Sequence, residues 1–315
     1  MIGGDAFSIP LLGCLDVAAG LQTRSGVFKK LKNSSHEKWF SRLANDLGSL
    51  EKRWNPPKPA SLLSLAESEP GYLPTGIESL PKVLGCKGYP LGRIVEIFGT
   101  ESSGKTTMAL QAIAAVNAMG GHCAFVDIEN GLNESYALKL GVDAKKCLVI
   151  RPTCAEHAFD AIELLLKSKH VALIVLDSVA ALSSKNEKLG NLSDEKFDGH
   201  QAKMISARLR RLSSYLAQGK TTLIFVNQLR EHFGEDGKTK EVSPGGHALK
   251  FYASIRLALK KGEMLQSQGG FEGHKTKVTT VKNRYFKPHR EHELKLVYGE
   301  GFKKEERFEQ KNAAQ

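Results

Sequence analysis

The sequence of 315 residues contains no hydrophobic run long enough to cross a membrane. A spanning helix needs roughly 18 consecutive apolar residues, and no stretch approaches that length. An apolar patch lies near the N-terminus, but Asp5 occupies a place where a secretory signal would carry lysine or arginine. We therefore expect a protein without membrane segments that works in the cytoplasm.

Cysteine is also scarce, and its spacing argues against a metal site. The cysteines are odd in number and widely scattered, at Cys14, Cys86, Cys123, Cys147 and Cys154. No pair has the C-x-x-C spacing of common metal ligands, and several lie in apolar stretches. We interpret them as buried, reduced thiols.

Acidic residues are fewer than basic ones. The chain has 34 Asp and Glu against 45 Lys and Arg, which gives a formal net charge of +11 and a pI near 9.3. A balance of this kind suits a protein that binds a polyanion, with an affinity that falls as salt rises. Charge alone does not identify the polyanion as nucleic acid.

The run IFGTESSGKTT, at residues 97–107, has the spacing G-x-x-x-x-G-K-[ST] of a phosphate-binding loop. It follows an apolar strand-like run and precedes an alanine-rich helical stretch, Thr106–Met119, as this motif requires. Its glycines let backbone N–H groups point at phosphate oxygens, and the helix N-terminus adds partial positive charge. We expect Lys105 to reach the β- and γ-phosphates of ATP and the Thr106 hydroxyl to join a Mg²⁺ shell. The predicted nucleotide-binding residues of the loop are Gly99, Thr100, Glu101, Ser102, Ser103, Gly104, Lys105, Thr106 and Thr107.

Strand-like and helix-like stretches alternate after the loop, which predicts an α/β fold with a mostly parallel sheet and helices on both faces. The expected strands are Gly92–Phe98, His122–Asp127, Cys147–Ile150, Val171–Asp177 and Thr221–Asn227. The expected helices after the first are Glu134–Leu140, Ala155–Ser168 and Gln201–Gln218. Three later stretches without helices between them, Phe251–Leu259, Lys275–Arg284 and His292–Tyr298, predict antiparallel strands that extend the sheet.

The sequence predicts four parts along the chain. Residues 1–34 are expected to be a poorly ordered extension, and residues 35–74 a helix, a proline-rich linker and a strand that pack on another body. The core is expected at residues 75–302, and a charged, frayed tail at 303–315. Two long polar intervals, at about 183–200 and 230–246, follow buried strands and so emerge beside the phosphate loop. Long loops of this kind are functional or disordered, and we expect these two to be functional.

Several polar residues follow strands at the same edge as the loop. Asp177 ends an apolar strand, where a carboxylate can hold Mg²⁺ beside Thr106 or simply cap the strand. Glu129 is the preferred candidate to activate the attacking water, and Asp127 is the alternative. Gln228 can bond the γ-phosphate and sense its loss, while Tyr136 can either stack on adenine or serve ordinary packing.

The chain resembles the bacterial RecA recombinase family in a series of segments that keep the family's order and spacing. These are GRIVEIFGTESSGKTT, CAFVDIEN, LIVLDSVAAL, LIFVNQLR, PGGHALKFYASIRL, TTVKNR and LVYGEGF, and the resemblance covers about Leu47 to Phe302. It implies a RecA-type P-loop ATPase core. It also implies that Glu129 is the catalytic glutamate, Asp177 the Walker-B aspartate, Gln228 the γ-phosphate sensor, and Tyr136 an adenine-stacking residue.

The resemblance also implies contacts between subunits. Lys282 and Arg284 match two basic positions that reach a neighbour's ATP, the second being lysine in the bacterial family. Lys250 and Phe251 match interface positions, and the segment SLLSLAE, which includes Leu62, resembles the strand that docks on a neighbouring protomer. The implied assembly is a helical filament.

The two polar intervals match the DNA-binding loops of the family. The resemblance assigns DNA contacts in the second interval to Arg230, Phe233, Gly245 and Gly246. Lys203 and Arg210 are further phosphate candidates on the following helix, with a solvated basic face as the alternative.

This sequence departs from the family in three places. The first polar interval is longer, the N-terminal 34 residues have no recognised counterpart, and the chain ends soon after LVYGEGF. We therefore expect the carboxyl-terminal domain and acidic tail to be absent, as in phage-encoded recombinases of the UvsX type. In that case the compartment would be the cytoplasm of an infected cell.

The implied function is that of an ATP-dependent DNA recombinase. Such a protein is a DNA-dependent ATPase that forms filaments on single-stranded DNA, pairs it with homologous duplex DNA and exchanges strands, in recombination and the repair of DNA damage. One alternative is a RecA-like regulatory or scaffold factor without strand exchange. A ring-shaped motor is another, and the docking segment and VKNR argue against it.

Overall fold

The computed structural model describes residues 71–183, 197–233, 239–242, 246–267 and 270–303. The chain divides into two units, Met1–Glu69 and Pro70–Gln315, and all the described residues belong to the second. The proposed N-terminal extension, nearly all of the docking segment with Leu62, Gly245 and the charged tail lie outside the described residues. Their expected roles therefore stay predictions.

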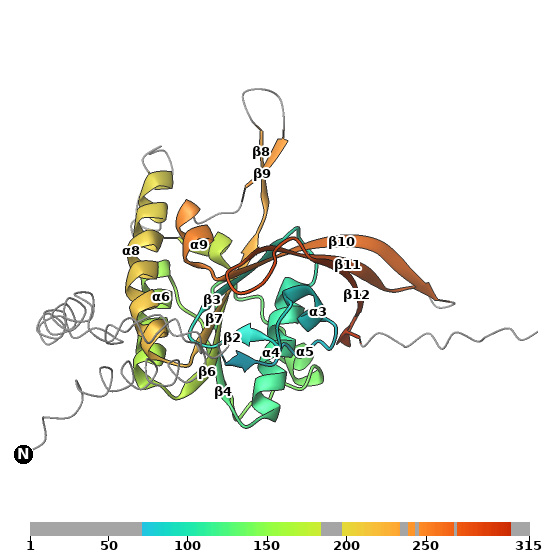
Figure 1. The fold of residues 1–315 in the computed structure, drawn as a ribbon, viewed down its shortest axis with the longest axis horizontal. Coiled ribbons are helices and arrows are strands. Elements are labelled where there is room, and N and C mark those ends of the chain that lie inside the picture. The colour runs from blue at the N-terminus through green and yellow to red at the C-terminus, as the bar shows by residue number, and fades with distance from the viewer. Residues whose placement is uncertain (1–70, 184–196, 234–238, 243–245, 268–269, 304–315) are drawn as a thin grey trace, which may run out of the picture. The chain divides into compact units, whose positions relative to one another are not determined.

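A nine-stranded sheet forms the centre of the second unit, in the order β13-β12-β11-β10-β3-β7-β6-β4-β5 (Figure 1). Its parallel part consists of β3 (Ile94–Gly99), β4 (His122–Asp127), β5 (Cys147–Ile150), β6 (Val171–Asp177) and β7 (Thr222–Gln228). The strand β10 (Ile255–Ser267) pairs in parallel with β3 and antiparallel with β11 (Gly270–Asn283). The antiparallel edge ends with β12 (Glu291–Val297) and β13 (Gly301–Phe302). The predicted fold class is therefore confirmed.

Alternate residues of the central strands enter two separate hydrophobic cores. In β4, Cys123 and Phe125 point into one core, whereas Ala124 and Val126 point into the other. The first core lies under α3 (Leu80–Leu84) and α4 (Lys105–Ala118). The second lies under α6 (Ala155–Ser168), α8 (Phe197–Gln218) and α9 (Gly246–Tyr252), on the opposite face in Figure 1. Strands buried on both faces explain the continuous apolar runs in the sequence.

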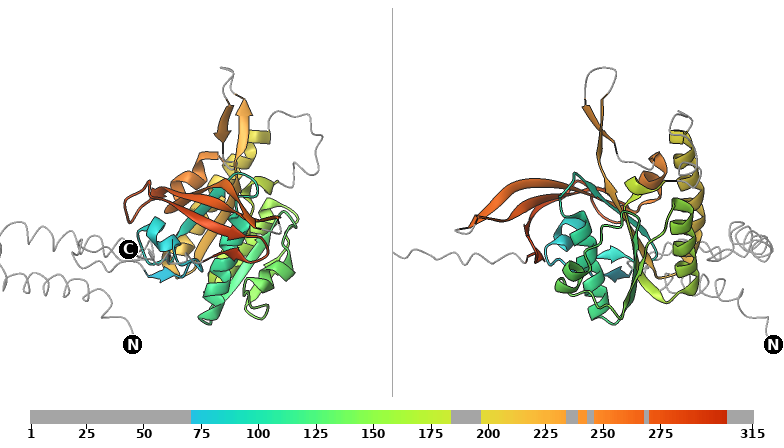
Figure 2. Two further views of the ribbon diagram at one scale, coloured as in Figure 1. Left: turned by 90° about the vertical axis from the view of Figure 1, so that its right-hand side faces the viewer. Right: turned by 180° about the vertical axis from the view of Figure 1, so that it is seen from behind.

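The smaller elements lie around this framework. The strands β1 (Tyr72–Leu73) and β2 (Tyr89–Pro90) pair with each other, α5 (Glu134–Lys139) follows β4, and a 3-10 turn, η2 (Val179–Ala181), follows β6. Figure 2 shows the long β10–β11 hairpin extending beyond the other strands of the sheet. None of the helices in the described ranges is both long and apolar enough to span a membrane.

The structure corrects several predicted elements. The helix α8 begins at Phe197, inside the first polar interval, and β11 begins at Gly270 rather than at Lys275. The expected strand Phe251–Leu259 begins only at Ile255, because the residues before it form α9. Leu249 and Ala253, four positions apart, both bury themselves in the second core, which favours the helix. The second polar interval is not an irregular loop, because β8 (Arg230–Phe233) and β9 (Thr239–Val242) pair as an antiparallel hairpin.

A buried polar cluster joins the strands at the centre of the sheet. The Arg256 guanidinium on β10 contacts the Glu96 carboxylate on β3 at 2.5 Å, and both side chains are almost fully buried. The Asn227 amide on β7 donates to the same carboxylate at 3.1 Å. The guanidinium also lies 4.4 Å from the centre of the Phe98 ring. This cluster links the strand before the phosphate loop to its two neighbours.

We expect Arg256→Met to lower the free energy of unfolding by about 3–5 kcal/mol, because it leaves the buried Glu96 charge without its cation. Urea unfolding followed by circular dichroism measures the change. The double variant Glu96→Gln with Arg256→Met removes both charges and should recover part of the loss. Equal stability of the single variant and the wild type would contradict a structural role for the pair.

Candidate active site

The phosphate loop lies between β3 and α4 and is shaped by two glycines. Gly99 passes so close to β10 that a Cβ atom there would lie 2.0 Å from the Leu259 carbonyl oxygen. Gly104 has a φ of 91°, and a Cβ there would lie 2.7 Å from Phe302 and 2.9 Å from Leu296. Only glycine combines the left-handed backbone with so little space. The loop is thus held by strands far away in sequence.

Lys105 starts α4 and folds over the loop. Its ammonium group donates to the Thr100 carbonyl oxygen at 2.6 Å, and its side chain is mostly buried. Burial lowers the pKa of Lys105, and the nearby carboxylates of Asp177, Glu129 and Glu101 oppose that shift. A lysine cation folded over a glycine-containing loop, whose backbone N–H groups can bind anions, is suited to phosphate oxygens.

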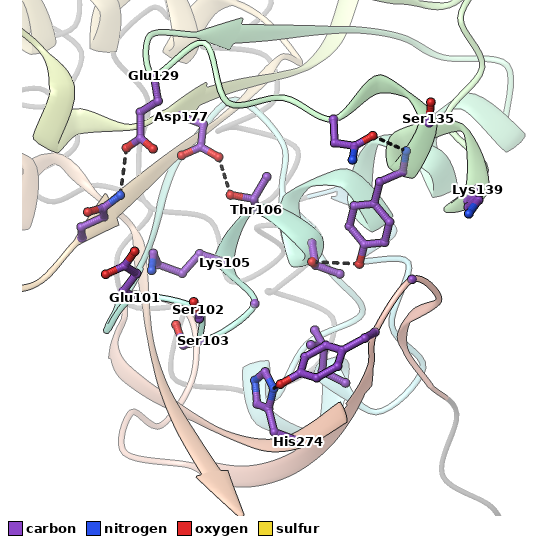
Figure 3. Close-up of a pocket in the computed structure, with 18 residues that line it drawn as sticks. Glu101, Ser102, Ser103, Lys105, Thr106, Glu129, Ser135, Lys139, Asp177 and His274 are labelled. Atoms are coloured by element: carbon purple, nitrogen blue, oxygen red, sulfur yellow. Dashed lines mark hydrogen bonds between the residues drawn. The ribbon is translucent and has the colours of Figure 1, made fainter. Parts of the chain in front are cut away.

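Thr106 and Asp177 meet at the head of the helix. The Thr106 hydroxyl donates to the Asp177 carboxylate at 2.6 Å, as Figure 3 shows. Burial raises the pKa of Asp177 to about 6, and the neighbouring Glu129 and Asp127 charges add to the effect. A buried carboxylate of this kind is stabilised by a cation.

These two oxygens fit a magnesium ion that is shared with a nucleotide. Among the described residues, no group of three or more His, Cys, Asp and Glu side chains could hold a metal alone. Mg²⁺ typically binds through one or two protein oxygens, waters and substrate phosphates. The oxygens of Thr106 and Asp177 therefore fit Mg²⁺ when nucleotide phosphates supply further ligands.

Glu129 and Asp127 have different surroundings. The Asp127 carboxylate is buried and accepts hydrogen bonds from the backbone N–H groups of Gly131 and Leu132, each at 3.2 Å. Glu129 is exposed, and its carboxylate accepts from the Gln228 amide at 2.9 Å and from the Ser178 hydroxyl. Asp127 thus holds the turn after β4, which favours Glu129 as the group that meets the reacting water.

The loop forms one side of a cavity of about 660 Å³. Figure 3 shows Glu129 and Asp177 at one end, beside the phosphate loop, and Ser135 and Lys139 of α5 at the other. Gln228 also lines the cavity and is bonded to Glu129, and Tyr136 lines it next to Ser135 in α5. The Tyr136 hydroxyl lies 3.1 Å from the Thr107 hydroxyl, and the Asn133 side chain caps α5 by accepting from the Tyr136 N–H at 2.9 Å. A triphosphate at the first end would place its nucleoside near Tyr136.

Several lining residues were not singled out from the sequence. They are Asn133, Ser135, Lys139, His274, Leu296, Tyr298 and Gly299. The last four reach the cavity because β11 and β12 lie against the phosphate loop, where the Thr276 hydroxyl donates to the Ser103 carbonyl oxygen at 3.3 Å. Tyr298 and Gly299 belong to the segment LVYGEGF, whose resemblance to the family could have identified them as site residues. No motif in the sequence includes His274.

The expected interface residues lie together, away from the cavity of their own chain. The Lys282 ammonium donates to the carbonyl oxygens of Lys250 and Phe251, at 2.7 and 3.0 Å, at the end of α9. Arg284 donates to the same Phe251 carbonyl at 2.8 Å. The Phe251 side chain is 69% exposed and lines a second cavity with Arg284.

The expected DNA-binding residues lie on three elements. Lys203 and Arg210 are exposed on α8, Arg230 and Phe233 lie in β8, and Gly246 begins α9. Figures 1 and 2 show the β8–β9 hairpin and α9 on the same side of the sheet as the N-terminal part of α8. Gly245 lies outside the described residues.

We expect Gly104→Ala to abolish ATP binding, because the new methyl group would strike Phe302 and Leu296 and displace the loop. Gly120→Ala is the matched control, since Gly120 has a similar φ of 86° but open space around it. Calorimetric titration with ATP compares the two variants. If Gly104→Ala bound ATP as tightly as Gly120→Ala, the loop would not depend on this contact.

Comparisons with known proteins agree with this arrangement. The family model of the RecA N-terminal domain matches residues 43–303. Protein RecA of Bacillus licheniformis and of Bacillus subtilis (strain 168) are each 42% identical to this chain over 259 residues, 82% of this chain and 74% of theirs. Protein RecA of Halalkalibacterium halodurans is 41% identical over the same length and shares. The chain therefore belongs to the RecA family and is a DNA-dependent ATPase and recombinase of DNA repair.

Proposed function

We propose that this protein binds ATP and Mg²⁺ in the cavity of the phosphate loop and uses them to assemble on single-stranded DNA. The observation that carries the proposal is the convergence of two pairs, Thr106 with Asp177 and Gln228 with Glu129, at one end of the cavity. These pairs supply a cation site and a water-activating group near Lys105. The expected compartment is the cytoplasm.

The phosphate end of the cavity divides the work among its side chains. Lys105 exchanges its bond to the Thr100 carbonyl for the β- and γ-phosphates. Thr106 and Asp177 would hold Mg²⁺, and a bound Mg²⁺ would supply positive charge for the phosphate oxygens. Glu129 orients the attacking water and accepts its proton. Because Glu129 is hydrogen-bonded to Gln228, the amide also limits where its carboxylate can lie.

Gln228 connects the nucleotide to the DNA-binding hairpin. It is the last residue of β7, and the next residue donates its backbone N–H to the Gly99 carbonyl at 3.1 Å before β8 begins. An amide that bonds the γ-phosphate loses that partner after hydrolysis. The loss would therefore act directly on the base of the β8–β9 hairpin, as in switches ordered by a γ-phosphate.

Lys282 and Arg284 are proposed to serve the nucleotide of a neighbouring subunit. Burial lowers the pKa of Lys282, the repulsion of the nearby Arg284 and Arg256 lowers it further, and Glu96 opposes the shift. A phosphate group from another chain would relieve this repulsion. A guanidinium in that place stabilises transition-state charge as an arginine finger does, so ATP hydrolysis would require assembly. Phe251 and Lys250 would form the contact around it.

DNA binding is proposed for α8, the hairpin and the start of α9. The exposed Lys203 and Arg210 would contact phosphates, and the net charge of +11 supports association with DNA. Phe233 would wedge between bases, and such contacts typically contribute about 1–3 kcal/mol per base with little sequence preference. The proposed partners are single-stranded DNA, homologous duplex DNA and further copies of this chain.

We expect Glu129→Ala to leave ATP binding intact and to lower ATP turnover on single-stranded DNA by about 10²–10⁴-fold, because the water loses its base. Turnover is measured by phosphate release, and binding by titration. Lys105→Ala is the contrasting variant, and it should lose binding itself. If Glu129→Ala hydrolysed ATP at the wild-type rate, Glu129 would not be the base, and another group would have to activate the water.

We expect Phe251→Ala to reduce filament formation, because it removes an exposed apolar side chain from the proposed subunit contact. Electron microscopy with single-stranded DNA and a non-hydrolysable ATP analogue measures filament length. Leu164→Ala, which removes a similarly exposed side chain from α6, is the control.

The same specimens test the wider proposal. Closed rings in place of long wild-type filaments would contradict the proposed assembly. Filaments that give no joint product with homologous duplex DNA would instead identify a regulatory or scaffold factor.

A further inference from the structure

His274 is the least explained side chain of the nucleotide cavity. It lies on β11, where it pairs in register with Leu296 of β12 and with Met264 of β10. Its side chain is only 1% exposed, yet it lines the cavity together with Tyr298. Among the described residues, its ring nitrogen Nε2 has no hydrogen-bond partner. Buried polar atoms are seldom left without partners, so this arrangement calls for an explanation.

The other ring nitrogen contacts Tyr298. The His274 Nδ1 atom lies 3.3 Å from the Tyr298 hydroxyl, and the two ring centres are 5.7 Å apart (Figure 3). Burial lowers the pKa of His274, and the charge of Lys261 lowers it further, so the imidazole is neutral at pH 7. A neutral imidazole carries one N–H and one bare nitrogen.

The position of the proton decides what Tyr298 can do. A buried N–H without an acceptor is rarer than a buried acceptor without a donor, which places the proton on Nδ1 and leaves Nε2 bare. Nδ1–H then donates to the Tyr298 oxygen. The hydroxyl of Tyr298, with its oxygen so occupied, keeps its own proton for another acceptor. Tyr298 is 47% exposed and lines the cavity, so that acceptor can belong to a ligand.

The backbone around Tyr298 is anchored to β11 and to the helix α4 that follows the phosphate loop. The Tyr298 N–H donates to the Glu272 carbonyl at 2.8 Å. Just beyond, the Gln111 side chain of α4 donates to the Phe302 carbonyl at 3.0 Å and accepts from the Phe302 N–H at 2.9 Å. The distance from the phosphate loop to Tyr298 is therefore set by the fold. The remaining freedom is that of the phenol ring and its hydroxyl.

We propose that His274 is a positioning residue for the nucleotide, which fixes Tyr298 so that its hydroxyl donates to an acceptor on the nucleoside. This inference rests on the proposed binding of ATP in the same cavity. Tyr298 and Tyr136 both line the cavity. Figure 3 shows His274, the partner of Tyr298, and Ser135, the neighbour of Tyr136, away from Glu129, where the nucleoside would lie. His274 therefore affects recognition of the nucleoside and leaves the phosphate contacts unchanged.

The test compares two ligands in the full-length chain. A slowly hydrolysed ATP analogue contains the nucleoside, whereas inorganic tripolyphosphate engages only the phosphate loop. We expect His274→Leu and Tyr298→Phe each to weaken the analogue by about two- to tenfold, the range for one hydrogen bond, and to leave tripolyphosphate unchanged. The double variant should be no weaker than either single one, because both remove the same interaction.

Conservative replacement separates positioning from packing. His274→Asn places an amide N–H near Nδ1 and should restore much of the affinity that His274→Leu loses. Tyr298→Phe removes one hydroxyl from a half-exposed ring, so this variant is expected to fold. It therefore tests the hydrogen bond to the nucleoside even if His274→Leu does not fold. Unchanged analogue affinity in Tyr298→Phe would overturn the inference, and so would additive losses in the double variant.

A further control distinguishes this inference from the proposed function. Wild-type protein should bind both ligands, and Lys105→Ala should bind neither. If the wild type bound neither ligand, the proposed function would fail. If it bound both while the Tyr298 and His274 variants matched it, only the role of His274 would fail.

Discussion

The close packing of the antiparallel strands against the phosphate loop is the constraint on which the site depends. β10 pairs with β3 up to Gly99, where a side chain would strike the Leu259 carbonyl. Gly104 lies against Phe302 and Leu296, and Thr276 donates to Ser103. The loop is thus shaped from outside as well as by its own glycines. A motif that looks local in the sequence is a tertiary structure in the protein.

The charged groups of the site depend on one another in a similar way. Burial lowers the pKa of Lys105 and raises that of Asp177, so each group is less stable as an ion than it would be in water. Phosphates and a divalent cation supply the missing opposite charges. Binding free energy would therefore stabilise the folded chain as well as prepare the reaction, since a ligand that binds only the folded state adds to its stability.

The parallel core and the phosphate end of the cavity could be predicted from the sequence because their signals are local. Apolar runs end in Asp177 and Gln228, and parallel strands bring such ends to one edge of the sheet. The structure indeed places Glu129 and Gln228 in contact. Tyr298 and His274 could not be placed, because their position depends on which strands pair. His274 reaches the cavity because it pairs with Leu296 in the register of β11 with β12. No motif near either residue announces that register.

The misplaced start of β10 has a related cause. The residues GHALKFY contain aromatic and apolar groups that suit either a strand or a helix. Contact with the second core, through Leu249 and Ala253, selects the helix. That choice also decides which carbonyl groups Lys282 and Arg284 can reach, because they bind the exposed end of α9. The resemblance assigned Lys250, Phe251 and the basic pair to one interface, but the hydrogen bonds between them depend on the helix.

The segment from Gln228 to Phe251 leaves the chain's own nucleotide cavity and ends beside Lys282 and Arg284. In the proposed assembly, its first residue meets the ATP of its own subunit, and its last residues hold Lys282 and Arg284, which meet the ATP of the next subunit. Such a contact joins unlike surfaces rather than forming a symmetric pair, and it builds an open chain of subunits when its rotation does not close a ring, as in the proposed filament. The two ends of that chain are chemically different. One terminal subunit keeps a phosphate loop that no neighbour completes, and the other has basic residues without a nucleotide to meet, so growth and loss of subunits would have a direction.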